Sequence, residues 1–128
     1  MPSPIRRIHH AQITVAASDV EAARSFYCGV MGFREIEKPE SLQGRGGIWL
    51  AMGEYGDHEL HIGVEEGVNR SATKAHLAYL VHDLPEWESH LLEAGIKPIE
   101  SIPIPGYRRL EFRDPFGNRV ELIEHDLI

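Results

Sequence analysis

The sequence predicts an α+β fold made of two tandem βαβββ modules, each carrying a curved mixed sheet. Two observations carry this prediction: strand-like and helix-like segments follow the same order in both halves, and short motifs recur at matching places. A fixed offset of roughly 60 residues between such motifs indicates a duplicated unit. We expect one domain over residues 1–128, with modules over about 8–64 and 75–124 and a polar linker over about 65–74.

The first module begins with a strand, because apolar and polar residues alternate from Ile8 to Val15. Ser18 and Glu21 have the spacing of a capping box, which predicts a helix that continues through VEAARSFYCGVM and ends near Gly32. Three strands separated by glycine-rich turns are expected next, over Phe33–Glu37, Gly47–Met52 and His58–Val64.

The second module repeats this order. A strand over His76–Val81 precedes a helix over Leu84–Glu93, for which Asp83 is the predicted cap and Gly95 follows the end. The remaining strands are expected over Lys97–Ser101, Tyr107–Arg113 and Asn118–Glu124. The motifs agree with this alignment: HAQITV from His10 matches HLAYLV from His76, and ELHIG from Glu59 matches VELIE from Val120.

The alternation of strand side chains predicts a candidate metal site. If the large apolar residues pack on the helices, the opposite faces of the outer strands carry His10, His61, His76 and Glu121. A carboxylate held away from water needs a cationic partner or a metal. We predict that these four residues bind one divalent ion (Fe, Ni, Zn, Mn or Co). A smaller set without His61 has the two-histidine, one-carboxylate pattern of Fe(II) oxygenases.

An alternative needs no metal: Glu121 pairs with Arg119 or Arg109 on an open sheet face. Three further residues are candidates for a substrate pocket. Trp49 alternates with Ile48 and Leu50, so we expect its side chain on the same face as the candidate ligands, where it would line a site for an apolar or aromatic substrate. The Arg109 guanidinium is suited to bind a substrate carboxylate, and the Tyr107 hydroxyl is suited to donate a hydrogen bond. A purely structural role is the alternative for each of them.

Composition narrows the class of protein. The chain has 42% hydrophobic and 26% charged residues, and a formal net charge of −7. This argues against nucleic acid or an anionic membrane as partner. The single cysteine, Cys28, allows no intrachain disulfide and fits a cytoplasmic setting. We expect no signal peptide, no membrane span and a small-molecule substrate.

The motifs HHAQITV, FYCGVMGF, ELHI, HLAYLVHDL and DPFGNRVELIE resemble those of the vicinal oxygen chelate superfamily. This superfamily includes glyoxalase I, extradiol dioxygenases, fosfomycin resistance proteins and bleomycin resistance proteins. The resemblance covers Ile8 to Glu124, and DPFGNRVELIE is its most specific part. It implies the glyoxalase/bleomycin resistance/dioxygenase fold, a cup around a metal, ligands at the four positions named above and, often, a homodimer.

The resemblance implies chemistry in which the metal stabilises an enolate-like or oxyanion state of a substrate with adjacent oxygens. Glyoxalase-like lyase or isomerase chemistry and Fe(II) dioxygenase chemistry both remain open. Glyoxalase I has a carboxylate where His61 stands here, so Glu121 is the catalytic candidate for proton transfer among the four. The alternative function is a protein of the bleomycin-resistance type, which sequesters a ligand without catalysis.

Overall fold

The computed structural model describes residues 1–126, so the last two residues of the predicted domain lie outside it. The chain divides into two compact units, Met1–Gly67 and a second unit that begins at Val68. The boundary falls inside the segment predicted as the linker between modules. Within the described residues, no helix has both the length and the apolar character that crossing a membrane requires.

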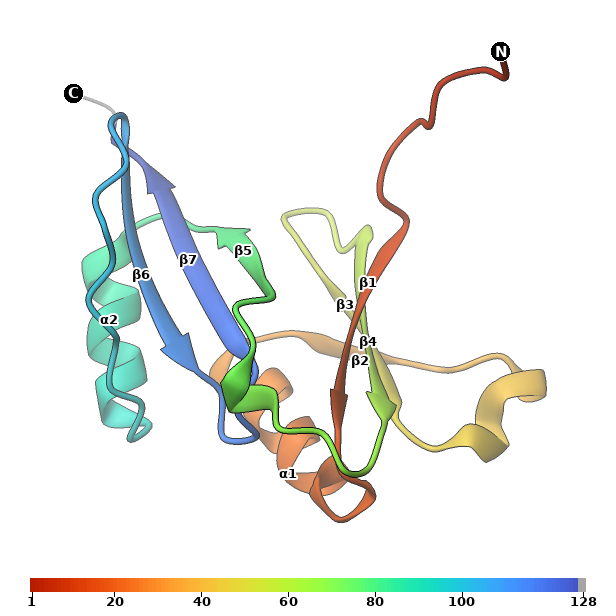
Figure 1. The fold of residues 1–128 in the computed structure, drawn as a ribbon. Coiled ribbons are helices and arrows are strands. Elements are labelled where there is room, and N and C mark those ends of the chain that lie inside the picture. Colours follow the sequence, from red (N-terminus) through yellow and green to blue (C-terminus); the bar gives the residue numbers. More distant parts are fainter. Residues whose placement is uncertain (127–128) are drawn as a thin grey trace. The chain divides into compact units, whose positions relative to one another are not determined.

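The first unit contains a four-stranded sheet with the order β1-β4-β3-β2 (Figure 1). β1 runs parallel to β4, and the β4–β3 and β3–β2 pairs are antiparallel. The strands cover His10–Val15 (β1), Arg34–Ile36 (β2), Ile48–Met52 (β3) and His58–Val64 (β4). All four predicted strands of this module are therefore confirmed, with β2 shorter than expected.

The helical segment of the first unit begins differently from the prediction. A 3-10 turn, η1 (Ala17–Asp19), precedes the short helix α1 (Val20–Arg24), which continues as a π-helical segment, η2 (Ser25–Val30). Ser18 lies inside η1, and neither η1 nor α1 has a side-chain cap, so the predicted capping box is wrong. The chain enters the helical segment before the predicted cap, and Glu66 Oε1 accepts from the amide of Ala17, the first residue of η1, at 2.8 Å.

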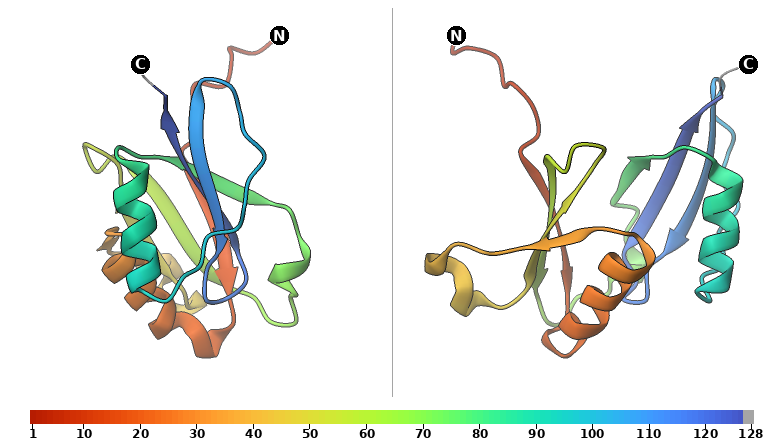
Figure 2. Two further views of the ribbon diagram at one scale, coloured as in Figure 1. Left: turned by 90° about the vertical axis from the view of Figure 1, so that its left-hand side faces the viewer. Right: turned by 180° about the vertical axis from the view of Figure 1, so that it is seen from behind.

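The second unit has a three-stranded sheet, ordered β5-β7-β6, whose strands cover His76–Leu80 (β5), Tyr107–Arg113 (β6) and Arg119–His125 (β7). The helix α2 (Leu84–Glu93) lies along one face of it (Figure 2). The predicted strand over Lys97–Ser101 is wrong: only Ile99 forms an isolated bridge, to Glu111. The Ile99 amide donates to the Glu111 carbonyl oxygen, but the backbone then leaves the ladder, and the Ile102 carbonyl oxygen accepts from the Arg109 side chain instead of from a strand.

The predicted start of α2 is confirmed. The Asp83 carboxylate accepts from the Glu86 amide at 3.2 Å, and Glu124 Oε2 accepts from the Leu84 amide at 3.0 Å. Two of the free amides in the first turn therefore have carboxylate partners. Gly95 follows the end of the helix with φ +81, a conformation that favours glycine.

The alternation of side chains along the strands separates core from candidate site in both units. Each sheet buries one set of apolar side chains, which are Val15, Leu50, Leu60 and Ile62 in the first unit and Leu110, Phe112, Val120 and Leu122 in the second. The residues between them in sequence face the other way. The polar face of each sheet thus carries the histidines and carboxylates that the sequence singled out.

Candidate functional site

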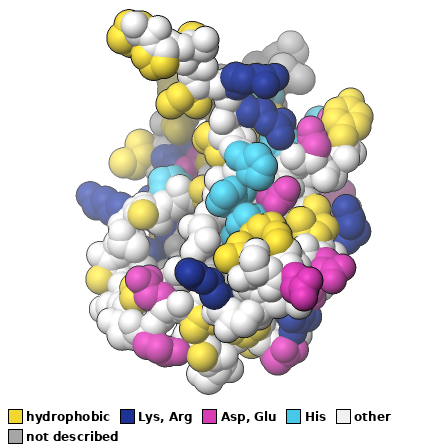
Figure 3. All heavy atoms as spheres, turned by 90° about the vertical axis from the view of Figure 1, so that its right-hand side faces the viewer, with side chains coloured by type: hydrophobic (Ala, Val, Ile, Leu, Met, Phe, Trp, Pro, Cys, Tyr) yellow, Lys and Arg dark blue, Asp and Glu magenta, His cyan; other side chains and the backbone are white. Residues whose placement is uncertain are grey.

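In the first unit, three aromatic rings form a stack across neighbouring strands. His61 on β4 lies between His10 on β1, at a ring-centroid distance of 4.1 Å, and Trp49 on β3, at 3.9 Å with an interplanar angle of 4°. The stack leaves His61 only 4% exposed. Histidine side chains gather on the face shown in Figure 3. The prediction that Trp49 shares a face with His10 and His61 is confirmed.

Glu59 completes this cluster, although it is not among the site residues predicted from the sequence. Its Oε1 lies 2.9 Å from His61 Nε2, and because a carboxylate only accepts, Nε2 carries the proton. The hydrogen bond from His61 lowers the pKa of Glu59, against a smaller opposing effect of burial. Glu59 lies two residues before His61 on β4, and side chains at this spacing share a sheet face. This spacing is the sequence feature that would have identified Glu59.

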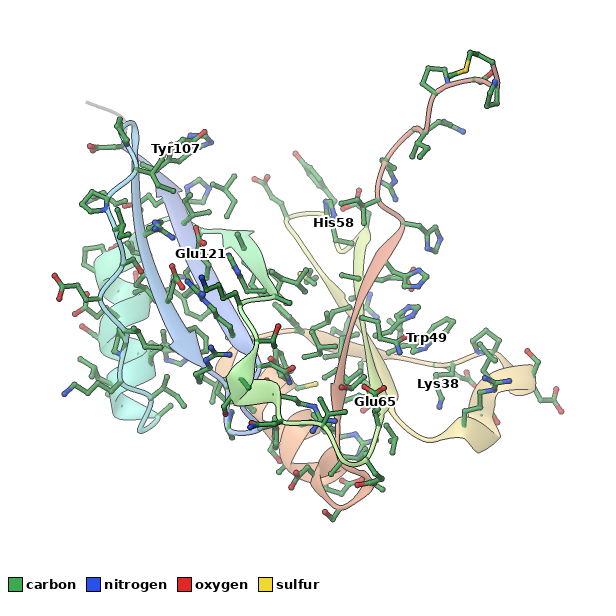
Figure 4. The ribbon with its side chains drawn as sticks, in the orientation of Figure 1. Lys38, Trp49, His58, Glu65, Tyr107 and Glu121 are labelled. Atoms are coloured by element: carbon green, nitrogen blue, oxygen red, sulfur yellow. The ribbon has the colours of Figure 1, made fainter. Side chains whose placement is uncertain are left out.

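A hollow of about 660 Å³ lies beside the ring stack, entirely within the first unit. Trp49 and Lys38, both of which line it, lie on the same side of this unit (Figure 4). Gly63 forms part of the wall, and a Cβ there would come within 2.6 Å of Gln12 Nε2. Glycine at this position therefore leaves room for the Gln12 amide on the face of the sheet.

In the second unit, His76 on β5 and Glu121 on β7 are in contact. His76 Nδ1 lies 2.9 Å from the Lys74 carbonyl oxygen, which only accepts, so Nδ1 carries a proton. In the neutral ring, Nε2 then presents its lone pair to Glu121 Oε1, 3.1 Å away. Glu121 is 5% exposed. An imidazole nitrogen and a carboxylate oxygen thus lie together, and the Lys74 backbone carbonyl orients the imidazole.

Glu121 also belongs to a network of ion pairs on the same sheet face. Arg109 Nη1 donates to Glu121 Oε1 at 3.2 Å and to Glu111 Oε1 at 2.7 Å. The other nitrogens of Arg109 donate to the Ile102 carbonyl oxygen, and Arg119 pairs with the second oxygen of Glu111. Burial alone raises the pKa of Glu111, but the hydrogen bond and charge of Arg119, together with the charges of Arg109 and His76, outweigh it and lower the pKa.

This network answers the alternatives left open by the sequence. Arg109 does pair with Glu121, as the metal-free alternative required, whereas Arg119 pairs with Glu111 instead. Arg109 shares the polar face with Glu121, as predicted, and its guanidinium is already engaged by protein groups. Tyr107 is partly exposed and contacts the His125 ring at 5.1 Å.

The four predicted metal ligands fall into two pairs, His10 with His61 in the first unit and His76 with Glu121 in the second. Over residues 1–126, no three His, Cys, Asp or Glu side chains gather closely enough to hold a metal by themselves. The predicted four-ligand site therefore stays a prediction. Each pair has the right donor types, since imidazole nitrogen and carboxylate oxygen are ligands for transition metals.

Comparisons with known proteins place the chain in a family. Residues 7–122 match the Glyoxalase/Bleomycin resistance protein/Dioxygenase superfamily. A putative glyoxalase family protein from Bacillus anthracis is 38% identical, with a TM-score of 0.88 over 98% of this chain and 100% of the other. A comparison with functionally curated proteins gives no match.

Two more distant structures share the fold. The fosfomycin resistance protein FosX from Listeria monocytogenes, complexed with Mn(II) and sulfate, is 16% identical, with a TM-score of 0.77 over 97% of this chain and 94% of that one. TnmS3, an antibiotic-binding protein from Streptomyces sp., is 23% identical, with a TM-score of 0.71 over 96% and 100%. The family match and the close structural relative, rather than these two, carry the assignment. The chain therefore belongs to the glyoxalase/bleomycin resistance protein/dioxygenase superfamily.

Proposed function

We propose that this chain is a metal-dependent enzyme that acts on a small molecule with adjacent oxygen atoms, by proton-transfer chemistry of the lyase or isomerase type. His10, His76 and Glu121 bind one divalent ion in this proposal, and His61 is a fourth ligand. When bound, the ion acts as a Lewis acid that stabilises negative charge on a substrate oxygen. The proposal covers one ion per chain, whether the two ligand pairs meet within a chain or between two chains.

The contact between His76 and Glu121 is the observation that carries the proposal. In a neutral His76 ring with its proton on Nδ1, two acceptors face each other at 3.1 Å, whereas in a doubly protonated ring Nε2 donates to Glu121. Such acceptors repel unless a cation lies between them, and either a divalent ion or a second proton on the ring meets this need. A metal-ligating histidine commonly donates its other N–H to a backbone carbonyl, as His76 does to Lys74.

The surroundings of Glu121 support a ligand role for it. Arg109 donates to the same oxygen that faces His76, and is itself anchored on the Ile102 carbonyl oxygen. This contact orients the carboxylate and leaves charge on it to share with a metal. The metal-free alternative uses the same contact, so the two readings differ in what lies between Glu121 and His76.

Glu59 favours proton transfer over dioxygenase chemistry. A carboxylate can accept a proton, and Glu59 Oε1 accepts a hydrogen bond from His61 Nε2 on the polar sheet face. The sequence analysis left Glu121 as the single carboxylate for this task. Glu59 adds a second one that is not itself a predicted ligand.

Hydrogen exchange tests the proposed reaction without knowledge of the product. Metal-loaded protein in D₂O is incubated with a panel of α-hydroxy and α-keto carbonyl compounds, and deuterium at the adjacent carbon is followed by NMR. We expect exchange that disappears when the metal is removed and returns when it is restored. Glu59→Gln should slow exchange with metal content unchanged, whereas Glu121→Gln should lose both.

His82→Ala is the matched control, because His82 is exposed and lies outside both clusters. It should change neither metal content nor exchange. Oxygen uptake with a catechol, in place of exchange, would assign the dioxygenase reaction. Tight binding of a small molecule with no metal and no exchange would support a ligand-sequestering role. Sedimentation of the purified protein tests the predicted homodimer.

A further inference from the structure

The hollow beside the ring stack has a lining whose charge is unusual for this chain. Its polar members are cationic or neutral: His9, His10, Gln12, Lys38, Arg45 and His61. None of the described residues that line it is Asp or Glu, although the chain has 20 acidic residues against 13 Lys and Arg. A concave surface lined by one sign of charge concentrates ligands of the opposite sign.

The segment that carries Arg45 is held in place by the rest of the unit. Arg45 ends the 3-10 segment η3 (Glu40–Arg45), and Lys38 Nζ donates to the next carbonyl, Gly46 O, at 2.6 Å. Gly46 has φ +73, and a Cβ there would lie 3.2 Å from Val64 Cγ2 on β4. Lys38 is thus used to close the loop. Arg45 is exposed at the hollow, with no hydrogen bond or ion pair within residues 1–126.

Trp49 and Leu42 add apolar residues to the lining of the hollow. His61 covers one face of the Trp49 indole and fixes its orientation in the stack. Trp49 is only partly buried, so the part of its indole that His61 does not cover can contact a planar group of a ligand. Arginine is also the cation best suited to a planar, two-oxygen anion, since its guanidinium donates two parallel hydrogen bonds.

We propose that this hollow binds a small molecule that combines a planar ring with a carboxylate-like anion, the ring against Trp49 and the anion at Arg45. The inference rests on the proposed function only in taking this molecule to be the substrate, because the binding itself needs no metal. It names the substrate class that the metal chemistry would act on.

The test uses metal-free protein, from which the chelator has been removed because chelators are themselves anions. Trp87→Phe makes Trp49 the sole tryptophan, so its fluorescence reports on the hollow, and calorimetry checks the affinity. Three probes separate the two parts of the proposal: benzoate has ring and charge, acetate has charge alone, and benzamide has the ring alone. Benzoate should bind more tightly than either of the others, and less tightly at high ionic strength.

Arg45→Gln should weaken benzoate binding by about tenfold or more, the usual value of a charge-assisted hydrogen bond. Arg34→Gln is the matched control: it removes the same charge from an exposed arginine of the same unit, outside the hollow, and should leave binding unchanged. Arg45→Lys should restore part of the affinity. If benzamide binds as tightly as benzoate, or if Arg34→Gln loses as much affinity as Arg45→Gln, the anion does not bind at Arg45. If acetate binds as tightly as benzoate, the ring makes no contribution to binding.

The outcomes also separate this inference from the proposed function. Metal binding with no preference for benzoate would reject the ligand class and leave the metal proposal standing. Benzoate binding lost in Arg45→Gln, in a protein that takes up no metal, would keep the ligand class and reject the enzyme.

Discussion

The two units place their candidate ligands at equivalent positions of a repeated module but hold them by different forces. In the first unit, His61 lies between two rings and makes an ionic contact with Glu59. In the second, Glu121 lies in a chain of ion pairs that includes Arg109, Glu111 and Arg119. The candidate ligands therefore occupy matching strand positions in the two units, while the groups that orient them differ.

This difference predicts different sensitivities. Stacked rings depend on shape and contact area, and respond to truncation of a ring. Buried ion pairs depend on every charge having its partner, and respond to loss of one partner and to pH.

Removing Glu111 should be the most damaging change in either cluster. Glu111 is 4% exposed and pairs with both Arg109 and Arg119, so Glu111→Ala leaves two largely buried guanidinium groups without this partner. We expect a loss of about 3–5 kcal/mol in the free energy of unfolding, measured by urea denaturation. A loss under about 1 kcal/mol would show that this network is no stronger than a surface pair.

Acid should weaken the second unit through the same residue. The pKa of Glu111 is lowered from its ordinary value of 4.5, so near and below that value the unfolded chain binds more protons than the folded one. The stability that Glu111 adds is therefore complete above its unfolded pKa and is lost as pH falls through the lower folded pKa. Unfolding free energies measured across this range should fall with acid, and less steeply in Glu111→Gln.

Truncating Trp49 should have a smaller, local effect in the first unit. Trp49→Ala uncovers one face of the His61 ring and removes an aromatic contact worth about 1 kcal/mol beyond the buried area. Trp49→Phe keeps a ring against His61 and should retain most of that energy. Proton NMR checks the assignment, because the His61 ring signals should move strongly in Trp49→Ala. If those signals stay in place, the stack is not formed in solution.

An exposed ion pair in the first unit supplies the smallest expected effect. Arg24 pairs with Glu35 and Glu21, but these side chains are 35%, 41% and 84% exposed. Glu35→Gln should change the unfolding free energy by less than about 1 kcal/mol, and salt should reduce even that. A loss as large as that of Glu111→Ala would mean that burial does not explain the difference between the two networks.

Much of the fold was predictable because it depends on local chemistry. The bounds of β4, β6 and α2 agree with the sequence prediction, since alternation, turns and the Asp83 cap are all local signals. The errors involve partners outside the predicted element. Glu66 binds the Ala17 amide where the helical segment begins, and the Arg109 side chain binds the Ile102 carbonyl oxygen just after the predicted strand.

The sequence predicts which site residues share a sheet face, but it does not predict which of them form ion pairs. Parity grouped His10 with His61 and placed Arg109 on the side of Glu121. Which glutamate meets which arginine depends on strand register: β6 and β7 place Glu111 opposite Glu121 and Arg113 opposite Arg119. A single sequence does not contain that register, so the Glu111 network emerged only in three dimensions, whereas the face of Glu59 was available from its spacing to His61.

The central claim is that the two unlike clusters hold one ion together. The most direct test is a competition titration with a chromophoric chelator, which gives the metal stoichiometry and Kd of the native protein, His10→Ala and His76→Ala, with His82→Ala as control. The account predicts one ion per chain and a large loss of affinity in both His10→Ala and His76→Ala, with no loss in the control. Loss of affinity in His76→Ala alone, with His10→Ala unchanged, would contradict it and confine the metal to the second unit.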